Sequence, residues 1–314
     1  MSLPTFSVLL GNYNKGAYIE GALQAIWRQS LRPDEIIIID DCSTDNSFSI
    51  VRNKYNDSDK IRIIKLDNNS GGPAKPSNIG IRNSNGEFIA FLDQDDIWDT
   101  NKLSQILNYL TCDNKIDVVC HDERLRIMGK STNVILHHGP YDKNFYKEML
   151  ISGNRLSTSA TCVRTSFLIN NNIYFNESSD YVIVEDYDLW LRLASQGAVF
   201  KFINQPLGEY AIQNKSISLN IKRARYNLEI LLKNHVNYTQ TFFDNKNRLW
   251  GIVSFRLLIS DIRSKYKNKF LFLEVFMYSR LIIRRPIGAI FYIRSFFKRR
   301  LRSHFLDFKT WKAR

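Results

Sequence analysis

Residues 87–96 read EFIAFLDQDD, and this stretch decides the fold class that we predict. Its first six residues are mostly apolar, which is typical of a strand buried on both faces, as in a parallel sheet. Three carboxylates follow at once, at Asp93, Asp95 and Asp96. In open α/β sheets ligands bind beyond the carboxyl ends of the strands, so we expect a polar, ligand-facing turn at 93–96.

The same alternation of strand and helix patterns extends on both sides of this stretch. Strand patterns occupy 6–10, 35–40, 61–66, 116–120 and 198–203. Helical spacing of apolar residues occupies 17–29, 45–54, 76–83, 101–111 and 185–195. Strands that alternate with helices predict an α/β class, with a Rossmann-like, mostly parallel sheet that is flanked by helices and joined by right-handed crossovers.

Charge divides the chain into two regions. Residues 221–314 hold 22 Lys and Arg against 5 Asp and Glu, a net charge of +17, whereas residues 1–220 carry a net charge of −4. A domain that gripped nucleic acid would not be acidic, so we expect no nucleic-acid partner for the main domain. We therefore predict one domain over 1–220 and a helical, basic extension over 221–314.

The basic extension is rich in Lys, Arg, Phe, Ile and Leu, and charges interrupt its apolar residues throughout 269–302. Since no run reaches the about 18 apolar residues that a spanning helix needs, we expect an amphipathic helix in the interface of an anionic membrane. A helical bundle that packs on the main domain and exposes a solvated basic face is the alternative. A nucleic-acid arm is a third interpretation, because basic and aromatic residues alone do not separate lipid from phosphate backbone.

Two further features indicate the compartment. Residues 1–6 lack the basic and apolar regions of a secretory signal. The four cysteines are scattered without C-x-x-C spacing, which argues against a zinc site or a disulfide framework and fits a reducing cytosol. We expect a cytoplasmic protein that is peripheral on the inner face of the membrane.

Three acidic clusters carry the predicted chemistry, and two of them follow strands. Asp40 and Asp41 can accept hydrogen bonds from a base or a ribose, or can simply belong to a turn that caps the next helix. Asp93 and Asp95 are spaced i, i+2 on a loop, where two carboxylates can converge on one hard cation such as Mg²⁺ or Mn²⁺. A solvated turn is the alternative for this second cluster.

The third cluster, Glu185 and Asp186, opens the predicted helix 185–195. Acidic residues in a first helical turn interact favourably with the helix dipole, which is the structural interpretation. In the functional interpretation Asp186 is a general base that takes a proton from an attacking hydroxyl, an effect of ~10²–10⁴-fold. A cation at Asp95 would then stabilise a leaving diphosphate.

Together these features resemble the family 2 glycosyltransferases of the GT-A fold. The resemblance covers about residues 5–218 and is carried by five blocks in the family's order. The blocks are 7–14 (SVLLGNYN), 36–45 (IIIIDDCSTD), 70–80 (SGGPAKPSNIG), 86–98 (GEFIAFLDQDDIW) and 185–193 (EDYDLWLRL).

The resemblance implies a role for each matching residue on the donor side. It assigns nucleotide-sugar binding to Gly11, Asn12, Tyr13, Asp41, Asn78 and Asp93, and we add Lys75 as a replacement for the Arg that is Ser77 here. Tyr13 would stack on the base, Asp41 would hydrogen-bond the uracil edge, and Asp93 would face the ribose and the donor sugar. Lys75 would offer positive charge to the diphosphate.

The remaining assignments concern the metal and the acceptor. Asp95 would bind Mn²⁺ or Mg²⁺ on the diphosphate, and Asp186 would be the catalytic base. Glu185 and Trp98 would contact the acceptor, unless Trp98 belongs to the core. His121, which precedes two acids at the end of the strand 116–120, would either contact the acceptor or form a polar strand end.

The family implies an inverting transfer of a hexose or N-acetylhexosamine from a nucleotide sugar, with UDP as the expected nucleotide. The expected acceptor is a saccharide or a lipid-linked saccharide in surface-polysaccharide synthesis. Residues 1–100 would form the nucleotide-binding half of the domain and residues 101–220 the acceptor half.

Three departures from the family's pattern bear on the metal and the diphosphate. Ser77 stands where Arg is common before Asn78, and Ala211 and Gln213 stand where Arg and His are common. Because an amide is a poorer metal ligand than imidazole, a catalytically decayed nucleotide-sugar-binding protein is the alternative function. A nucleotidyltransferase has less support, since no glycine-rich, basic phosphate loop lies near the first strand.

Overall fold

The computed structural model describes residues 3–55, 58–141, 144–213, 220–238 and 246–265. The chain divides into two compact units, which we describe separately. The first unit comprises Met1–Lys143 and Arg155–Ala224, and the second comprises Asn144–Asn154 and Arg225–Arg314. The division after residue 224 lies close to the boundary that charge suggests, but the short segment 144–154 groups with the C-terminal part of the chain.

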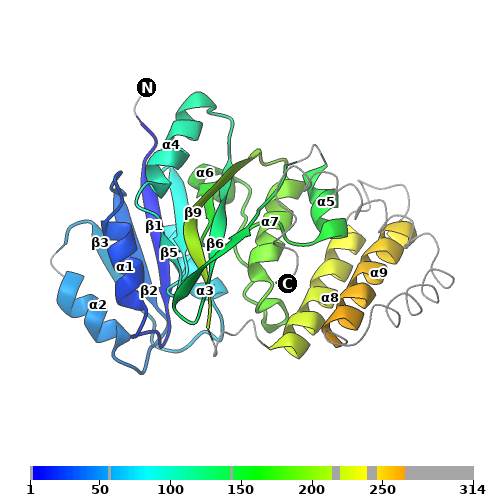
Figure 1. The fold of residues 1–314 in the computed structure, drawn as a ribbon, viewed down its shortest axis with the longest axis horizontal. Helices are drawn as coiled ribbons and strands as arrows, with labels where there is room; N and C mark the ends of the chain where they lie inside the picture. Colours follow the sequence, from blue (N-terminus) through cyan, green and yellow to red (C-terminus); the bar gives the residue numbers. More distant parts are fainter. Residues whose placement is uncertain (1–2, 56–57, 142–143, 214–219, 239–245, 266–314) are drawn as a thin grey trace. The chain divides into compact units, whose positions relative to one another are not determined.

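One nine-stranded sheet organises the described residues of the first unit (Figure 1). Its order is β3-β2-β1-β4-β8-β6-β9-β5, and β7 pairs with β6. The strands are β1 Phe6–Asn12, β2 Glu35–Asp40, β3 Ile61–Lys65, β4 Phe88–Leu92, β5 Ile97–Trp98, β6 Val118–Ile127, β7 Lys130–Leu136, β8 Thr161–Arg164 and β9 Phe200–Ile212.

The strand β1 lies where the strand order changes direction. It pairs in parallel with β2 on one side, Val8 opposite Ile36, and with β4 on the other, Val8 opposite Ala90. The strand β3 continues the parallel set on the far side of β2. Such a switch point leaves a crevice beyond the carboxyl ends of the two diverging strands, which is where α/β sheets bind ligands.

The sheet is mixed rather than mostly parallel beyond β4. The short strand β8 pairs antiparallel with both β4 and β6, and β9 returns parallel to β6. The α/β class and the flanking helices are therefore as predicted, whereas the second half reverses direction. A four-residue strand such as β8 carries too little pattern to reveal its direction from sequence.

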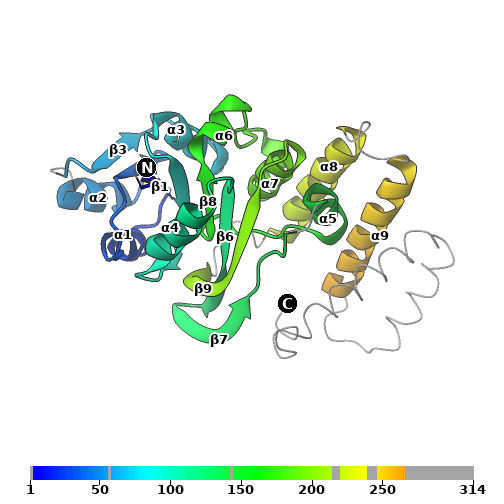
Figure 2. The same ribbon diagram turned by 90° about the horizontal axis from the view of Figure 1, so that it is seen from above.

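Helices cover both faces of this sheet (Figure 2). They are α1 Ile19–Trp27, α2 Ser47–Tyr55, α3 Ala74–Asn83, α4 Lys102–Cys112, α6 Thr165–Asn170, the 3₁₀ turn η1 Ser179–Tyr181 and α7 Glu185–Ser195. The helices α1 and α4 pack on the face of Val8 and Leu10. On the other face α3 approaches closely, because a Cβ at Gly80 would lie 2.9 Å from Cδ1 of Leu9.

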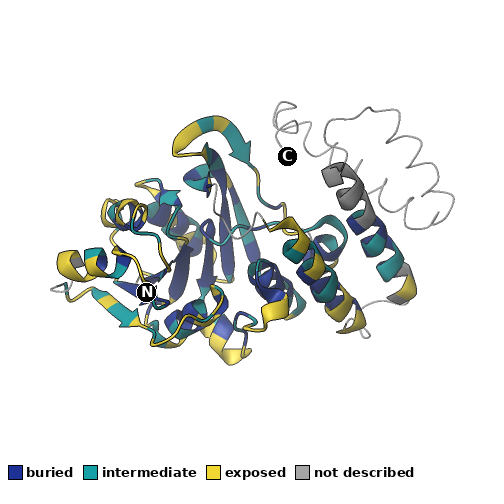
Figure 3. Cartoon of the chain, turned by 90° about the horizontal axis from the view of Figure 1, so that it is seen from below, coloured by how far each residue is buried: buried dark blue, intermediate teal, exposed yellow. Residues whose placement is uncertain are grey.

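The central strands form the core of the first unit, and Figure 3 shows them as its most continuously buried part. Residues 36–39 of β2 and all of β4 are buried, which explains their uninterrupted apolar sequences. Each large apolar side chain that is fully buried contributes about 1.5–3 kcal/mol. This rigid core holds the polar residues at the strand ends in fixed positions.

The described residues of the second unit are helical. They belong to α5 Phe145–Ser152, to α8 Ile221–Tyr238 from residue 225 onward, and to α9 Lys246–Lys265. The Tyr146 hydroxyl lies 3.1 Å from Nδ1 of His235, and Arg256 donates to the carbonyl of Met149 at 3.4 Å, so α5 contacts both longer helices. Among the residues that the structure describes, no helix has the length and apolarity to cross a bilayer. The predicted amphipathic segment 269–302 lies outside the described residues.

Candidate active site

Polar residues gather where β1, β2 and β4 end. The strand β1 ends at Asn12, β2 ends at Asp40, and β4 ends just before Asp93. Asn12 lies opposite Asp40 in the parallel register. The first two acidic clusters of the sequence therefore lie at one edge of the sheet, as expected.

Asn12 fastens the ends of β1 and β2 together. Its side-chain Nδ2 donates to Asp40 at 2.6 Å, to Ser47 at 2.9 Å and to Ser43 at 3.2 Å. The residue is only 2% exposed. The predicted contribution of Asn12 to a nucleotide site is therefore to hold the loop, because its amide is buried and engaged.

Tyr13 and Gly11 provide accessible surface next to the hydrogen-bonded Asn12. The Tyr13 side chain is 41% exposed, and its backbone N–H donates to Oε1 of Gln94 at 2.8 Å. A Cβ at Gly11 would meet no atom within 4 Å. An exposed ring held by the backbone is suited to stacking on a planar base.

Asp41 is buried and held by the loop that follows β3. Oδ1 accepts from the backbone N–H of Ser70 at 2.8 Å, and Oδ2 accepts from the Ser70 hydroxyl at 2.8 Å and from Asn69 at 2.9 Å. Burial raises the pKa of Asp41, while these hydrogen bonds and the positive charge of Lys75 oppose the rise. The predicted partners Asp41 and Lys75 thus lie in one electrostatic neighbourhood.

The acidic loop 93–96 divides its three carboxylates between two roles. Asp96 is 3% exposed, and its Oδ1 accepts from the backbone N–H of Ala211 at 2.7 Å, so it fastens β9 to the loop. Asp95 forms an ion pair with Lys15 at 3.0 Å, and its carbonyl accepts from Arg126. Asp93 keeps accessible surface and is anchored through its backbone N–H by the Ser159 hydroxyl at 3.0 Å.

Asp93 links the acidic loop to the third cluster. Desolvation by nearby protein atoms raises the pKa of Asp93, and repulsion from Asp95, Asp186 and Glu123 adds to the rise. The rings of Phe91 in β4 and Trp190 in α7 lie 6.4 Å apart, centroid to centroid, so α7 packs against the end of β4. The structure thus brings together the predicted metal ligand, the donor-facing carboxylate and the predicted base.

A divalent cation fits the carboxylates of Asp93 and Asp95. Mg²⁺ and Mn²⁺ are commonly bound by one or two carboxylates and complete their shell with water and substrate phosphates. Among the described residues no group of three or more His, Cys, Asp or Glu could hold a metal by itself. Asp95 already binds a cation in the form of the Lys15 ammonium, which shows that the loop attracts positive charge.

The start of α7 is held in a strained conformation. Ile183 has a φ of 79°, a left-handed value that is unusual for a β-branched residue. Glu185 is 9% exposed; burial raises its pKa to about 8, and repulsion from Asp186 adds to this rise. Oδ1 of Asp186 accepts from the backbone N–H of Tyr187 at 2.6 Å. The protein therefore holds two acids side by side in a setting where Glu185 retains its proton at neutral pH.

Asn78 acts on the segment that leads to α7. Its Oδ1 accepts from the Phe175 N–H at 2.8 Å, and its Nδ2 donates to the Phe175 carbonyl at 2.9 Å and to Glu177 at 2.7 Å. The side chain is 1% exposed. Its predicted part in donor binding is therefore one of positioning, since its amide is fully engaged inside the protein.

Trp98 lies in the core beneath the acidic loop. It is 3% exposed, and its Nε1 donates to the Ser159 carbonyl at 2.8 Å. The buried Lys102 donates to the same carbonyl at 2.6 Å and lies 3.6 Å from the Trp98 ring centroid. Burial lowers the pKa of Lys102 to about 7. A tryptophan this enclosed serves an acceptor site only through the loop that it supports.

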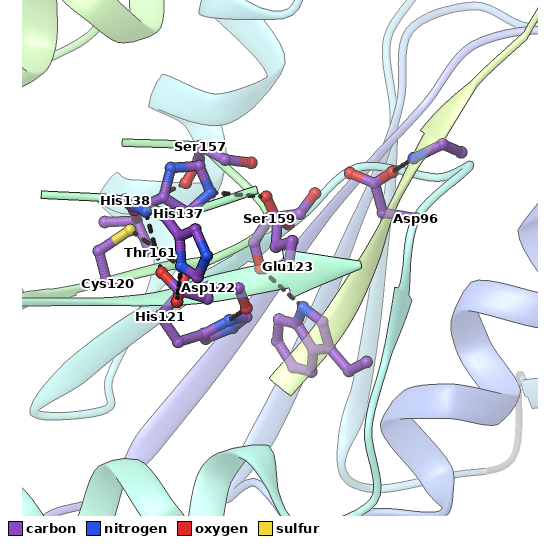
Figure 4. Close-up of polar contacts among 12 residues, drawn as sticks. Asp96, Cys120, His121, Asp122, Glu123, His137, His138, Ser157, Ser159 and Thr161 are labelled. Atoms are coloured by element: carbon purple, nitrogen blue, oxygen red, sulfur yellow. Dashed lines mark hydrogen bonds and ion pairs between the residues drawn. The ribbon is translucent and has the colours of Figure 1, made fainter. Parts of the chain in front are cut away.

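Histidines and acids of β6 and the segment after β7 form a second polar cluster, in which Figure 4 shows the ring of His138 turned toward Glu123. Nε2 of His138 lies 3.0 Å from Glu123, and Nδ1 of His137 lies 2.6 Å from Asp122. His121 is fully buried, and burial holds its pKa well below the usual value. Neutral and enclosed, His121 fits the polar strand end better than an acceptor contact.

The two departures at the end of β9 are both buried. Ala211 is bonded through its backbone N–H to Asp96, so the side chain there plays no part in that contact. Oε1 of Gln213 accepts from the Tyr18 hydroxyl at 3.3 Å. Its Nε2 has no hydrogen-bond partner within the described part of the chain.

Sequence reasoning missed several residues that shape this site. Lys15, Gln94 and Ser159 each contact the acidic loop or its neighbour Tyr13. A Lys, Gln or Ser does not by itself indicate a functional site, because polar residues in loops are usually solvated. The signal that was available is position: Lys15 and Gln94 each lie within a few residues of a strand's carboxyl end.

The parallel half-sheet, its switch point and the acids beyond it are features of the GT-A fold. The sequence model of "Glycosyl transferase family 2" matches residues 7–174, which is more than half of the chain. The chain therefore belongs to glycosyl transferase family 2.

Three characterised or named relatives show how the likeness is distributed. The poly(ribitol-phosphate) beta-N-acetylglucosaminyltransferase TarS of Staphylococcus aureus is 32% identical over 177 residues, which is 55% of this chain and 30% of TarS. The putative teichuronic acid biosynthesis glycosyltransferase TuaG of Bacillus subtilis is 27% identical, covering 69% of this chain and 82% of TuaG. The Escherichia coli glucosyltransferase WfaP, which uses UDP-Glc and alpha-D-GlcNAc-diphosphoundecaprenol, is 31% identical, covering 68% of this chain and 80% of WfaP.

Solved structures support the fold. TarS 1–349 in complex with UDP-GlcNAc superposes with a TM-score of 0.60 at 21% identity, over 80% of this chain and 72% of that one. The Pyrobaculum calidifontis mannosyltransferase PcManGT in complex with GDP-Man and Mn²⁺ gives a TM-score of 0.57 at 16% identity, over 95% of this chain and 87% of that one.

Proposed function

We propose that the protein is an inverting glycosyltransferase that moves a hexose or N-acetylhexosamine from a UDP-sugar to a saccharide or lipid-linked saccharide. The observation that carries the proposal is the shared electrostatic neighbourhood of Asp93, Asp95 and Asp186. A single displacement requires the base and the donor-side acids to face one site, so that the acceptor hydroxyl reaches the anomeric carbon. The names of TarS and WfaP support a sugar donor and an acceptor of surface-polysaccharide type.

In this proposal different residues of the chain bind different parts of the donor. Tyr13 offers its exposed ring to the base, and Asp41 offers a fixed carboxylate to the base edge. Asp93 faces the ribose and the sugar, and Lys75 adds positive charge near Asp41. Asp95 would hold Mn²⁺ or Mg²⁺, which stabilises negative charge on a leaving diphosphate.

Asp186 acts on the acceptor. Its carboxylate takes the proton of the attacking hydroxyl as that oxygen bonds to the anomeric carbon and the bond to the diphosphate breaks. One displacement inverts the configuration, and a single base with no partner nucleophile is sufficient for it. Protonated Glu185 lies beside this base and can donate a hydrogen bond to the acceptor.

The membrane is part of the proposal through the basic extension. The net charge of +17 over 221–314 favours an anionic surface. A lipid-linked acceptor at the inner face of the membrane would explain why one chain combines the transferase domain with such an extension. We therefore place the protein on the cytoplasmic side, attached peripherally.

A decayed nucleotide-sugar-binding protein is the second candidate, and the replacements at Ala211 and Gln213 favour it. Transfer assays with a panel of UDP-sugars, saccharide acceptors and Mn²⁺ separate the two. We expect turnover in the wild type, loss of ~10²–10⁴-fold in Asp186→Asn, and loss of metal dependence in Asp95→Ala. The exposed Asp59→Asn is the matched control. Tight UDP-sugar binding without turnover in the wild type would instead establish the decayed protein.

A further inference from the structure

Lys15 forms an ion pair with Asp95, the carboxylate that is predicted to bind the metal. Its Nζ lies 3.0 Å from Oδ2 of Asp95, and the two side chains are 20% and 17% exposed. The predicted metal position at Asp95 is therefore taken by a cation of the chain itself.

The backbone of Lys15 is anchored by hydrogen bonds, and its side chain is long. Its carbonyl accepts from the backbone N–H groups of Tyr18 at 2.8 Å and Ile19 at 2.9 Å, which anchors the residue to the start of α1. A lysine ammonium sits on a flexible four-carbon stem, so Nζ can exchange partners without a change of fold.

A second position for an anion lies beside Lys15. Nζ is 5.5 Å from the Tyr18 ring centroid, and the Tyr18 hydroxyl donates to Oε1 of Gln213. Gln213 is 7% exposed, and its Nε2 donor has no partner among the described residues. A buried donor without a partner costs free energy, and an anionic oxygen would satisfy it.

We propose that Lys15 is an internal counter-cation that a divalent metal must displace from Asp95, so that metal and diphosphate bind as a coupled pair. Lys15 released from Asp95 pairs with the diphosphate, next to Tyr18 and the free donor of Gln213. This inference rests on the proposed function. It gives a role in anion binding to Lys15 and to Gln213, which stands where His is common in the family's pattern.

If the metal displaces Lys15 from Asp95, substitution of Lys15 should change the affinities for metal and for UDP in opposite directions. Without Lys15 the metal has no competitor at Asp95, so its affinity in the absence of nucleotide increases. The diphosphate loses a positive partner at the same time, so the affinity for UDP decreases. A residue that only maintained the fold would weaken both.

The experiment measures Mn²⁺ binding by electron paramagnetic resonance and UDP binding by calorimetry, in the full-length wild type and in Lys15→Met. We expect Lys15→Met to bind Mn²⁺ alone about three- to tenfold more tightly and UDP more weakly. The factor by which UDP tightens Mn²⁺ binding should fall by a similar amount, because this coupling is reciprocal. Lys15→Arg, which keeps the charge, should restore both wild-type affinities at least in part.

Lys54→Met is the matched control, since Lys54 forms an ion pair with the exposed Glu20. It should leave both affinities unchanged. Equal or weaker Mn²⁺ binding by Lys15→Met, with an intact thermal transition, would overturn the inference even in an active transferase. Tighter Mn²⁺ binding by Lys15→Met, with no UDP binding by the wild type, would instead refute only the proposed donor.

Discussion

Asp186, in the first turn of α7, raises the pKa of Asp93, at the end of β4. These two residues lie far apart in the sequence, one directly after a strand and the other at the start of a helix. Their proximity joins the predicted base to the donor-side carboxylate. The proposed single displacement needs this proximity, because base and donor must meet at one reaction centre.

Glu185 gives the protein a characteristic dependence of stability on pH. Its pKa is raised to about 8, so between about pH 4.5 and 8 the folded state retains a proton that the unfolded state has lost. The free energy of unfolding therefore falls as pH rises through this range. Glu185→Gln removes this term, so its stability relative to the wild type should increase from pH 5 to pH 8.

Urea unfolding at pH 5, 6.5 and 8 measures this difference. The exposed Glu20→Gln serves as the control and should show no such gain with pH. A constant difference between Glu185→Gln and the wild type would show that Glu185 ionises at its ordinary pH in the folded protein.

At Ile183, substitution by glycine should reduce stability less than substitution by alanine. Its φ of 79° is readily adopted by glycine, whereas any residue with a Cβ is strained there by about 1–3 kcal/mol. Ile183→Gly and Ile183→Ala remove nearly the same apolar surface. We expect the glycine variant to be the more stable by about 1 kcal/mol, because the relief of strain exceeds the cost of the greater entropy of its unfolded chain.

Urea denaturation of the two variants tests this order, which is opposite to that found at ordinary positions. An alanine variant that equals or exceeds the glycine variant in stability would contradict the strained conformation. The activity of both variants reports how far the strain also orients Asp186.

Asn78 should act on stability more than on donor binding. Asn78→Ala leaves the N–H and the carbonyl of Phe175 without their buried partners, which costs about 1–3 kcal/mol for a group of this kind. We expect a lower melting temperature, with UDP affinity in the folded protein changed by less than about threefold. Ser77→Ala, at the neighbouring position, is the control. A large loss of UDP affinity without a loss of stability would restore the direct donor contact that the sequence suggests.

The basic extension should determine membrane binding. Deletion of 269–314 removes most of the apolar and basic residues beyond α9, so the shortened protein should no longer sediment with phosphatidylglycerol vesicles. Binding of the full-length protein should weaken as salt rises, because counter-ions screen its attraction to the lipid. Neutral phosphatidylcholine vesicles are the control. Equal sedimentation of both proteins would exclude this role of the extension.

The sequence by itself determined the half of the fold that is built from repeated patterns. The strand β2 and the helix α7 have the predicted bounds, because buried apolar runs and helical spacing are local properties. The acids at the ends of β2 and β4 were recognisable for the same reason, since each directly follows a strand.

The tertiary structure alone decided which polar residues are accessible and which pair with one another. It buried Asn78 and Trp98, joined Asp96 to Ala211, and set Lys15 on Asp95. Such pairings arise between segments distant in sequence, where packing rather than local pattern chooses the partner. The short strand β8 reversed the sheet's direction for the same reason, because pairing with β4 and β6, not its own four residues, fixes its orientation.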